Sequence, residues 1–161
     1  MKILIFDKTT ELRRNRIELE GKLKVKITVE GKKVTIEGDP LDEYEASVIL
    51  SAINLGFSAR KALSLNEESK IFRILNIKDI TRKKNLKHVR ARIIGTEGKT
   101  KRTIENISGA NIVIKDNEIG IIGNAELIEE IVTAVSNLVR GTKQSNTYRY
   151  LEKMNRNKKL Q

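Results

Sequence analysis

The chain has 161 residues, of which 39% are hydrophobic and 33% are charged, and its net charge is +11 at pH 7. This length fits one ordinary domain or two small ones, because domains usually run from roughly 50 to 200 residues. The absence of cysteine excludes disulfides, thiolate metal sites and cysteine nucleophiles. No apolar run approaches the roughly 18 residues that span a bilayer, and residues 1–7 are too few for a signal-peptide core. We therefore expect a soluble, cytoplasmic protein without a membrane partner.

The first half of the sequence reads as a strand, a helix, a hairpin and two further helices. Residues 22–36 alternate polar and apolar side chains on both sides of a Glu30-Gly31 turn, as the two strands of a hairpin do. Pro40 lacks a backbone N–H and therefore suits the first turn of a helix. The expected elements are a strand at residues 2–6, a helix from Thr9 or Thr10 to about Leu19 that Gly21 closes, the hairpin, and helices at residues 40–55 and 58–65.

The second half repeats this order after a polar segment, Asn66 to Lys70, which we take as a domain boundary. The expected elements are a strand at residues 71–77, a helix ending at Ile94, a glycine loop at 95–98, a helix at 99–107, a hairpin at 112–122, a helix that Asn124 caps, and a terminal helix at 145–158. Both halves read helix, hairpin, helix, so the sequence predicts a degenerate internal duplication. The predicted fold class is α+β, with domains at residues 1–66 and 71–161, each a three-stranded antiparallel sheet packed on helices.

The positive charge is concentrated in the second half. Residues 1–75 carry 14 Lys and Arg against 12 Asp and Glu, whereas residues 76–161 carry 18 against 9. Between Lys78 and Arg102 there are ten basic residues and two acidic ones. Such a stretch attracts phosphate backbones and releases counterions on binding, although a charge run taken alone is as often a solvated face. The second half is therefore the half expected to bind a polyanion.

A short glycine motif, Gly95-Thr96-Glu97-Gly98, lies within this basic stretch. Two glycines between helices let the backbone approach phosphates without interference from side chains. The N-terminus of the following helix offers free N–H groups and the positive end of the helix dipole. A G-x-x-G loop in this setting is typical of a clamp for the backbone of about four unpaired nucleotides, whose bases then lie in an apolar groove.

The candidate RNA-binding residues are those of the loop and its basic and apolar neighbours. They are Arg90, Arg92, Ile94, Gly95, Thr96, Glu97, Gly98, Lys99, Thr100, Lys101, Arg102 and Ile114. For the apolar groove and the core beneath it, the candidates are Ile93, Ile94, Ile104, Ile112 and Ile114, and at least half of them are expected to be core. We expect no catalytic residue, no metal ligand and no cofactor.

These motifs resemble those of KH proteins, and more narrowly of the archaeal tandem-KH family related to the eukaryotic partner of the Nob-one endonuclease in small-subunit ribosome assembly. The resemblance covers most of the chain and rests on residues 92–109, 119–123 and 141–152 of the second half and on residues 34–40 and 55–63 of the first. It implies two type I KH domains and a role in binding the 3′ end region of the small-subunit (16S) ribosomal RNA during maturation. It also implies a Nob-one-like endonuclease or a translation initiation factor as a protein partner.

The sequence departs from that family's pattern in two places. Where the first domain would have its own glycine loop, the chain has Phe6-Asp7-Lys8-Thr9, without either glycine, so the first domain is expected to be degenerate. Inside the second loop, Glu97 occupies a position where a neutral or basic residue would suit a phosphate better. Lys99 and Lys101 can offset this charge.

Two alternative functions and one alternative RNA-binding fold compete with this interpretation. A KH subunit of an RNA-degrading, exosome-like complex or of a transcription-elongation complex is disfavoured by the sequence segments at residues 55–63 and 141–152. A ribonuclease would need an acidic metal cluster or a histidine set, but His88 is the only histidine and Asp79 and Glu97 are the only acids of the basic stretch. An RRM stacks bases on sheet aromatics, and residues 73–147 contain no Phe, Tyr or Trp.

Overall fold

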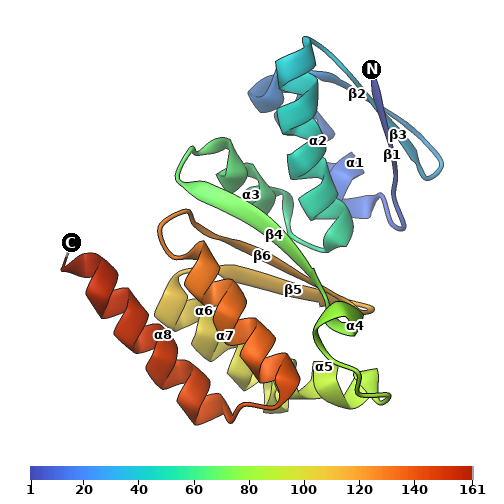
Figure 1. Cartoon of the computed structure of the whole chain (residues 1–161). Coiled ribbons are helices and arrows are strands. Elements are labelled where there is room, and N and C mark those ends of the chain that lie inside the picture. Colours follow the sequence, from blue (N-terminus) through green and yellow to red (C-terminus); the bar gives the residue numbers. More distant parts are fainter. Residues whose placement is uncertain (161) are drawn as a thin grey trace. The chain divides into compact units, whose positions relative to one another are not determined.

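The chain forms two compact units in a computed structural model that describes residues 1–160 (Figure 1). The first unit is Met1–Glu68, and the second begins at Ser69. Each unit contains one three-stranded antiparallel sheet with helices, which confirms the expected α+β class. None of the helices within residues 1–160 is long and apolar enough to cross a membrane.

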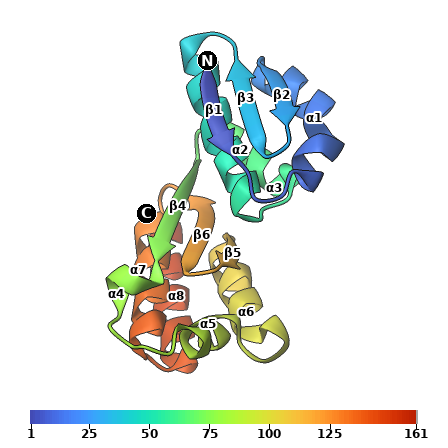
Figure 2. The same cartoon turned by 90° about the vertical axis from the view of Figure 1, so that its right-hand side faces the viewer.

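In the first unit, helices α1 and α2, whose bounds follow, pack against one face of the sheet (Figure 2). Its elements are β1 (Lys2–Ile5), α1 (Thr10–Leu23), β2 (Lys26–Glu30), β3 (Lys33–Glu37), α2 (Pro40–Leu55) and α3 (Ala59–Leu63). The strand order is β1-β3-β2, so β1 and β2 are both edge strands. The predicted alternation holds within the hairpin, where Ile27, Val34 and Ile36 are buried. Its first strand begins at Lys26 and not at residue 22, because Lys22 and Leu23 lie in α1.

Helix α1 does not end where the sequence predicts. Gly21 lies inside the helix, which continues to Leu23 and ends at Lys24, a residue with a left-handed φ of 58°. The physical reason is packing, since Leu23 is buried and extends the core-facing row that begins with Leu12 and Leu19. The N–H of Lys24 donates to the carbonyl of Glu20 and closes the last turn.

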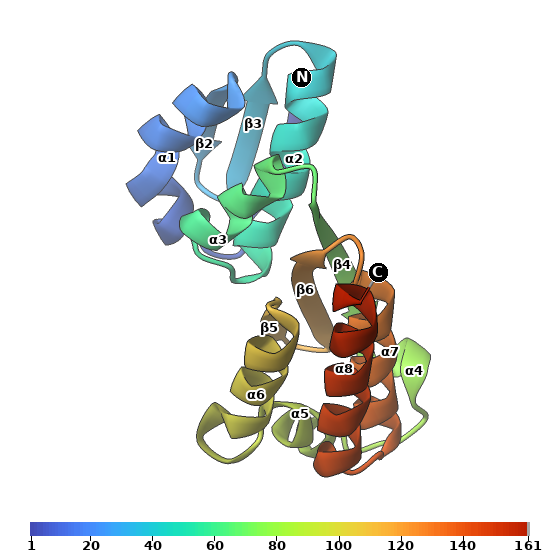
Figure 3. The ribbon, with the colours of Figure 1, turned by 90° about the vertical axis from the view of Figure 1, so that its left-hand side faces the viewer.

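The second unit has the same sheet order with more helix around it. Its elements are β4 (Lys70–Asn76), α4 (Ile77–Ile80), α5 (Leu86–Ile94), a 3-10 turn (Thr96–Gly98), α6 (Lys99–Ser108), β5 (Asn111–Lys115), β6 (Glu118–Asn124), α7 (Ile128–Arg140) and α8 (Gln144–Lys159). The strand order is β4-β6-β5, with all pairs antiparallel. Helix α8 packs beside both α6 and α7 (Figure 3).

The start of α7 differs from the prediction that Asn124 would cap this helix. Asn124 instead ends β6, where it pairs with Lys70 of β4, and its carbonyl accepts the N–H of Leu127 in a turn. The helix begins at Ile128, so the sheet pairing of Asn124 outweighs its preference for a cap. Buried side chains from α7, including Ile131, Val135 and Leu138, face the core of this unit.

The two units repeat one detailed arrangement, which supports the predicted duplication. In the first, the side chain of Glu20 on α1 accepts the backbone N–H of Ile27 on β2 at 2.9 Å. In the second, Glu105 on α6 accepts the N–H of Ile112 on β5 at 2.9 Å, with both residues 85 positions later. Each glutamate also pairs with a cation one helical turn earlier, at 3.3 Å in both units. Helix α1 therefore corresponds to α6, and β2 to β5.

The units differ in the connection between the first strand and this helix. In the second unit, residues 77–98 supply α4, α5 and the glycine loop before α6 begins. In the first unit, only residues 6–9 join β1 to α1. Helix α3, which comes last in its unit, packs against α1 and α2 as α5 packs against α6 and α7. A later segment of the chain therefore takes the place of the missing helix.

Glu43 is an ionised group with a defined partner in the first unit. Its carboxylate is buried and lies 2.7 Å from the N-terminal ammonium of Met1, and it also accepts the N–H of Gly38. The hydrogen bond from the ammonium lowers the pKa of Glu43 below its ordinary value, against the raising effect of burial.

Candidate nucleic-acid interface

The glycine loop has a backbone conformation that depends on its glycines. Gly95 and Gly98 have φ values of 79° and 76°, and Glu97 between them has a φ of 54°. A side chain on Gly95 would collide with the hydroxyl and the backbone nitrogen of Thr100. The loop is closed by a hydrogen bond of 3.1 Å from the Gly98 N–H to the Gly95 carbonyl. Glycine at position 95 is therefore required by both its conformation and its surroundings.

Helix α6 begins directly after this loop, with Gly98 as its N-cap residue and no side-chain cap. The N–H groups of its first turn and the positive end of its dipole are thus directed toward the loop. Lys99 and Arg102 are exposed, and neither has an ion-pair or hydrogen-bond partner in the part of the chain that the structure describes. Glu97 is exposed as well. The N–H groups of Gly98 and Lys99 already donate to the carbonyls of Gly95 and Thr96. An anion at the loop would meet the positive end of the α6 dipole and two uncommitted cations.

Three other candidate cations are already bound within the protein. The guanidinium of Arg92 donates to the carbonyls of Leu138 and Thr142, at 3.1 and 2.9 Å, and so ties α5 to the end of α7. Arg90 donates to the side chain of Asn117 in the β5–β6 turn at 2.8 Å. Lys101 pairs with Glu105 at 3.3 Å. The two arginines thus fix α5, which precedes the loop, and all three cations have fewer donors left for a ligand.

The isoleucines considered for the groove fall into two groups. Ile93, Ile104 and Ile112 are buried in the core of the second unit. Ile94 is 38% exposed, and Ile114 is half-buried at the edge strand β5. Thr100, also among the candidates, is buried beneath the loop. Only Ile94 and Ile114 thus remain available to contact a base.

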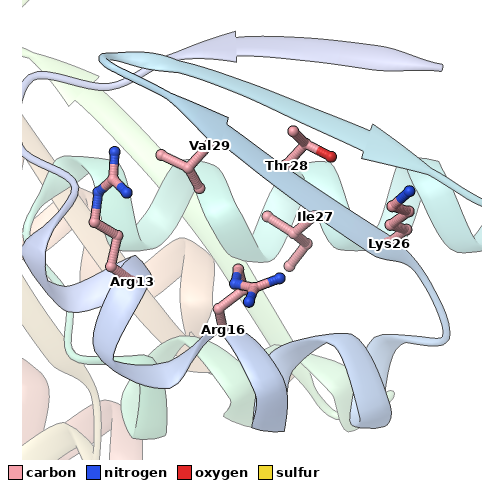
Figure 4. A pocket seen from close by; sticks show the side chains of 6 residues that line it. All are labelled: Arg13, Arg16, Lys26, Ile27, Thr28 and Val29. Atoms are coloured by element: carbon pink, nitrogen blue, oxygen red, sulfur yellow. The ribbon is translucent and has the colours of Figure 1, made fainter.

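The first unit has a basic groove that our sequence analysis did not identify. It lies between α1 and the edge strand β2, has a volume of about 320 Å³, and is lined by Arg13, Arg16 and the four residues 26–29 (Figure 4). The side chains of both arginines project from α1 toward β2. Because α1 and β2 correspond to α6 and β5, this groove is the counterpart of the surface beside the glycine loop. The i, i+3 spacing of the two arginines was the available signal.

The arginines of this groove already have partners close by in sequence. Arg13 donates to the hydroxyl of Thr9 at 3.0 Å, and Arg16 pairs with Glu20 at 3.3 Å. At the position of the missing glycine loop, the carboxylate of Glu11 accepts the N–H of Ala59 at 2.8 Å. A carboxylate of the first unit therefore takes a position that corresponds to the glycine loop of the second. No group of three or more potential metal-ligating side chains occurs within residues 1–160.

Comparison with known proteins gives a consistent set of similarities. The model of the eukaryotic-type KH domain (KH-domain type I) matches residues 71–156. A KH domain-containing protein of Methanocaldococcus jannaschii is 35% identical over 143 residues, which are 85% of this chain and 63% of that protein. The RNA-binding protein PNO1 of Oryzias latipes is 37% identical over 109 residues, which are 65% of this chain and 44% of that protein. This chain thus spans less than two thirds of the length of either relative.

Among solved structures, the chain is similar to one from Pyrococcus horikoshii that is described as an a/eIF2alpha–aDim2p–rRNA complex. The TM-score is 0.87 and the sequence identity is 34%, with 97% of this chain and 94% of that chain covered. The likeness covers both units.

Proposed function

This chain belongs to the eukaryotic-type (type I) KH-domain family as a PNO1/Dim2-like KH protein, and on that premise we propose that it binds single-stranded RNA through residues 95–98. The observation that carries the proposal is the loop itself. Gly95 and Gly98 bring the backbone to the surface at the N-terminus of α6, beside the uncommitted cations Lys99 and Arg102. These donors match the chemistry of a phosphate backbone.

The proposed clamp holds the strand by its phosphates and leaves the bases to the apolar surface next to it. Fixed N–H groups bind an anion without first losing side-chain freedom, whereas a lysine or an arginine must be ordered. Ile94 and Ile114 then offer apolar contact to bases that are not paired. A duplex would present its phosphates without free bases, so the site favours a single strand.

The RNA that we propose is the 3′ end region of small-subunit ribosomal RNA in its maturation. The support is the similarity to the aDim2p structure, which is described as a complex with rRNA. The same structure includes a/eIF2alpha, and we extend the proposal to a translation initiation factor as protein partner. A Nob-one-like endonuclease is a further proposed partner that rests on the family resemblance alone.

We propose that the role is binding without catalysis. The loop provides backbone donors and cations that suit a phosphate in its ground state, and its one carboxylate, Glu97, is exposed. A ribonuclease is the alternative from another class. Incubating the chain with a labelled single strand and Mg²⁺ or Mn²⁺ separates the two, because time-dependent cleavage at enzyme-like rates would contradict a binding role.

A double substitution in the loop tests the proposed site. Changing Thr96→Asp together with Glu97→Asp places two carboxylates on short side chains in the clamp, so we expect RNA binding to be lost while the circular dichroism spectrum is retained. Binding is measured by fluorescence anisotropy with a labelled unstructured RNA. Asn157→Asp, an exposed site near the end of α8, is the control for added charge. Unchanged affinity of the double variant would rule out this loop as the site.

A further inference from the structure

A cavity lies behind the glycine loop, where the start of α8 meets the loop and the start of α6. Its volume is about 480 Å³, and it is lined by Ala91, Arg92, Gly95, Thr96, Lys99, Thr100, Gln144 and Tyr148. No residue of β5 lines it, so it is distinct from the surface between α6 and β5 on which bases are expected to lie. Pockets that bind small ligands usually measure about 300 to 1,000 Å³.

The cavity collects polar groups that have no partner in the protein. Within residues 1–160, no hydrogen bond or ion pair engages the side-chain amide of Gln144, the hydroxyl of Tyr148, the hydroxyl of Thr96 or the ammonium of Lys99. Arg92 differs, because its guanidinium is bound to two backbone carbonyls. Among residues 1–160, no carboxylate side chain lines the cavity. Several uncommitted polar groups that converge on one cavity are typical of a ligand site.

The chemistry of these groups matches one nucleotide. Tyr148 is half-buried against the core of the second unit, which fixes one side of its ring and leaves an aromatic surface at the cavity. Aromatic rings of this kind stack on unpaired bases. The amide of Gln144 both donates and accepts hydrogen bonds, as recognition of a base edge requires. Lys99 supplies the cation that a phosphate needs.

We propose that this cavity takes one unpaired base of the RNA strand that the glycine loop clamps. The inference rests on the proposed function and assigns to it a second, opposite base site. Gly95, Thr96 and Lys99 belong to both the loop and the cavity wall. A phosphate bound at the loop therefore leaves the adjoining nucleotide within reach of the cavity. The strand would then divide its bases between the β5 side of α6 and the α8 side.

This site also supplies an aromatic contact that the sequence pattern did not suggest. Residues 73–147 contain no Phe, Tyr or Trp, and Tyr148 is the next residue along the chain. Helix α8 packs against α6 and so returns Tyr148 to the loop, 50 residues after Gly98 in sequence.

The test compares the two half-buried tyrosines of α8 in the full chain. Tyr148→Leu removes the ring from the cavity but keeps an apolar side chain, and Tyr150→Leu makes the same change where no cavity residue is altered. The probes are labelled rA8 and rU8, with affinity measured by anisotropy at two salt concentrations. We expect Tyr148→Leu to weaken binding of at least one probe about ten-fold, as loss of one stacked base would. The loss should be equal at both salt concentrations, because stacking is uncharged.

Two further measurements separate a base site from a role in packing. Tyr148→Phe keeps the ring and should bind within about two-fold of the wild type. Photo-crosslinking with 4-thiouridine in the rU8 probe, followed by peptide mass spectrometry, should place a crosslink on Gln144 or Tyr148. Wild-type affinity of Tyr148→Leu for both probes, or crosslinks confined to α6 and β5, would overturn this inference and leave the clamp intact. A wild-type chain that binds neither probe would overturn the proposed function itself.

Discussion

The two units share one framework and differ in the chemistry they can offer a phosphate. In the second unit, the N-terminus of α6 directs the positive end of the helix dipole toward the loop, and Lys99 and Arg102 are uncommitted. In the first unit, the corresponding surface has only side-chain cations, and both of its arginines have partners, Arg13 at the N-cap residue Thr9 and Arg16 at Glu20 of α1. The first unit thus lacks the long connection that forms the clamp in the second unit, but it keeps the groove between its helix and its edge strand.

This difference shows which part of the framework carries which role. The glutamate that links helix to strand is present in both units at the same distance from its partner, so it belongs to the fold. The glycine loop is present in one unit only, so it belongs to the site. Four sets of substitutions separate the two roles, beginning with the one expected to have the largest effect.

We expect the largest effect from substitution of a glycine in the loop, compared with substitution of a glycine in a helix of the framework. Gly95→Ala places a methyl group against Thr100 and strains a left-handed residue, so we expect RNA binding to weaken about a hundred-fold, near the upper end of the energy stored in such strain. The matched control is Gly21→Ala on α1, where a methyl group meets no atom within 4 Å. That variant should bind RNA normally and gain roughly 0.5 to 1 kcal/mol of stability in urea unfolding. Equal RNA affinity of the two variants would contradict the role of Gly95.

The shared glutamates should behave alike in the two units. Glu20→Ala and Glu105→Ala each leave a strand N–H without its acceptor, so each should lower the stability of its own unit by about 1 to 3 kcal/mol. Amide hydrogen exchange measures the two units separately in one sample. If one of the two substitutions left the stability of its unit unchanged, the two glutamates would not stabilise their units in the same way.

Paired removal of cations should affect the units unequally. Lys99→Gln with Arg102→Gln removes the two uncommitted cations beside the loop and should weaken RNA binding about ten-fold at low salt, with a shallower salt dependence. Arg13→Gln with Arg16→Gln removes the same charge from the groove of Figure 4 and should weaken binding by about three-fold or less. Comparable losses of affinity would mean that the RNA contacts both units and that each contributes similarly to binding.

The smallest expected effect concerns Glu43, and it is confined to the first unit. Its pKa is lowered in the folded state by the Met1 ammonium, so its ionised form stabilises the fold above its unfolded pKa of about 4.3. That contribution is lost as the pH falls through the lower folded pKa. Glu43→Gln should therefore reduce hydrogen-exchange protection of α2 at pH 7 and have little effect near pH 3. Glu45→Gln, at an exposed site on the same helix, is the control.

The sequence predicts most of the framework because its periodicities are local. Alternation at residues 26–36 and the apolar spacing of α7 each reflect a single buried face, and the structure confirms both. The expected start of the first hairpin strand at residue 22 is wrong, because Lys22 and Leu23 belong to α1. The errors are at element ends. Gly21 was expected to close a helix that continues to the buried Leu23, and Asn124 was expected to cap a helix but ends a strand. Both depend on packing or pairing with distant residues.

The motif of the candidate site can be predicted from the sequence, but which of its side chains are available to a ligand cannot. The loop and its positive charge follow from residues that are adjacent in sequence. Sequence could not show that Arg92 is bound to carbonyls near residues 138–142, or that Tyr148 returns to the loop. The arginine groove of the first unit was missed for the same reason, because it is formed by a helix and a strand together.

The most direct test of the clamp is a titration of the ¹⁵N-labelled chain with unstructured RNA, followed by amide chemical shifts. Binding at the glycine loop predicts that the largest shift changes fall on the N–H groups of residues 95–99, with smaller changes at Ile114. Changes along α1 and β2 should be weaker and should appear at higher RNA concentration. If the amides of residues 95–99 stayed in place while those of α1 and β2 moved, the loop would not be the clamp and this account would be wrong.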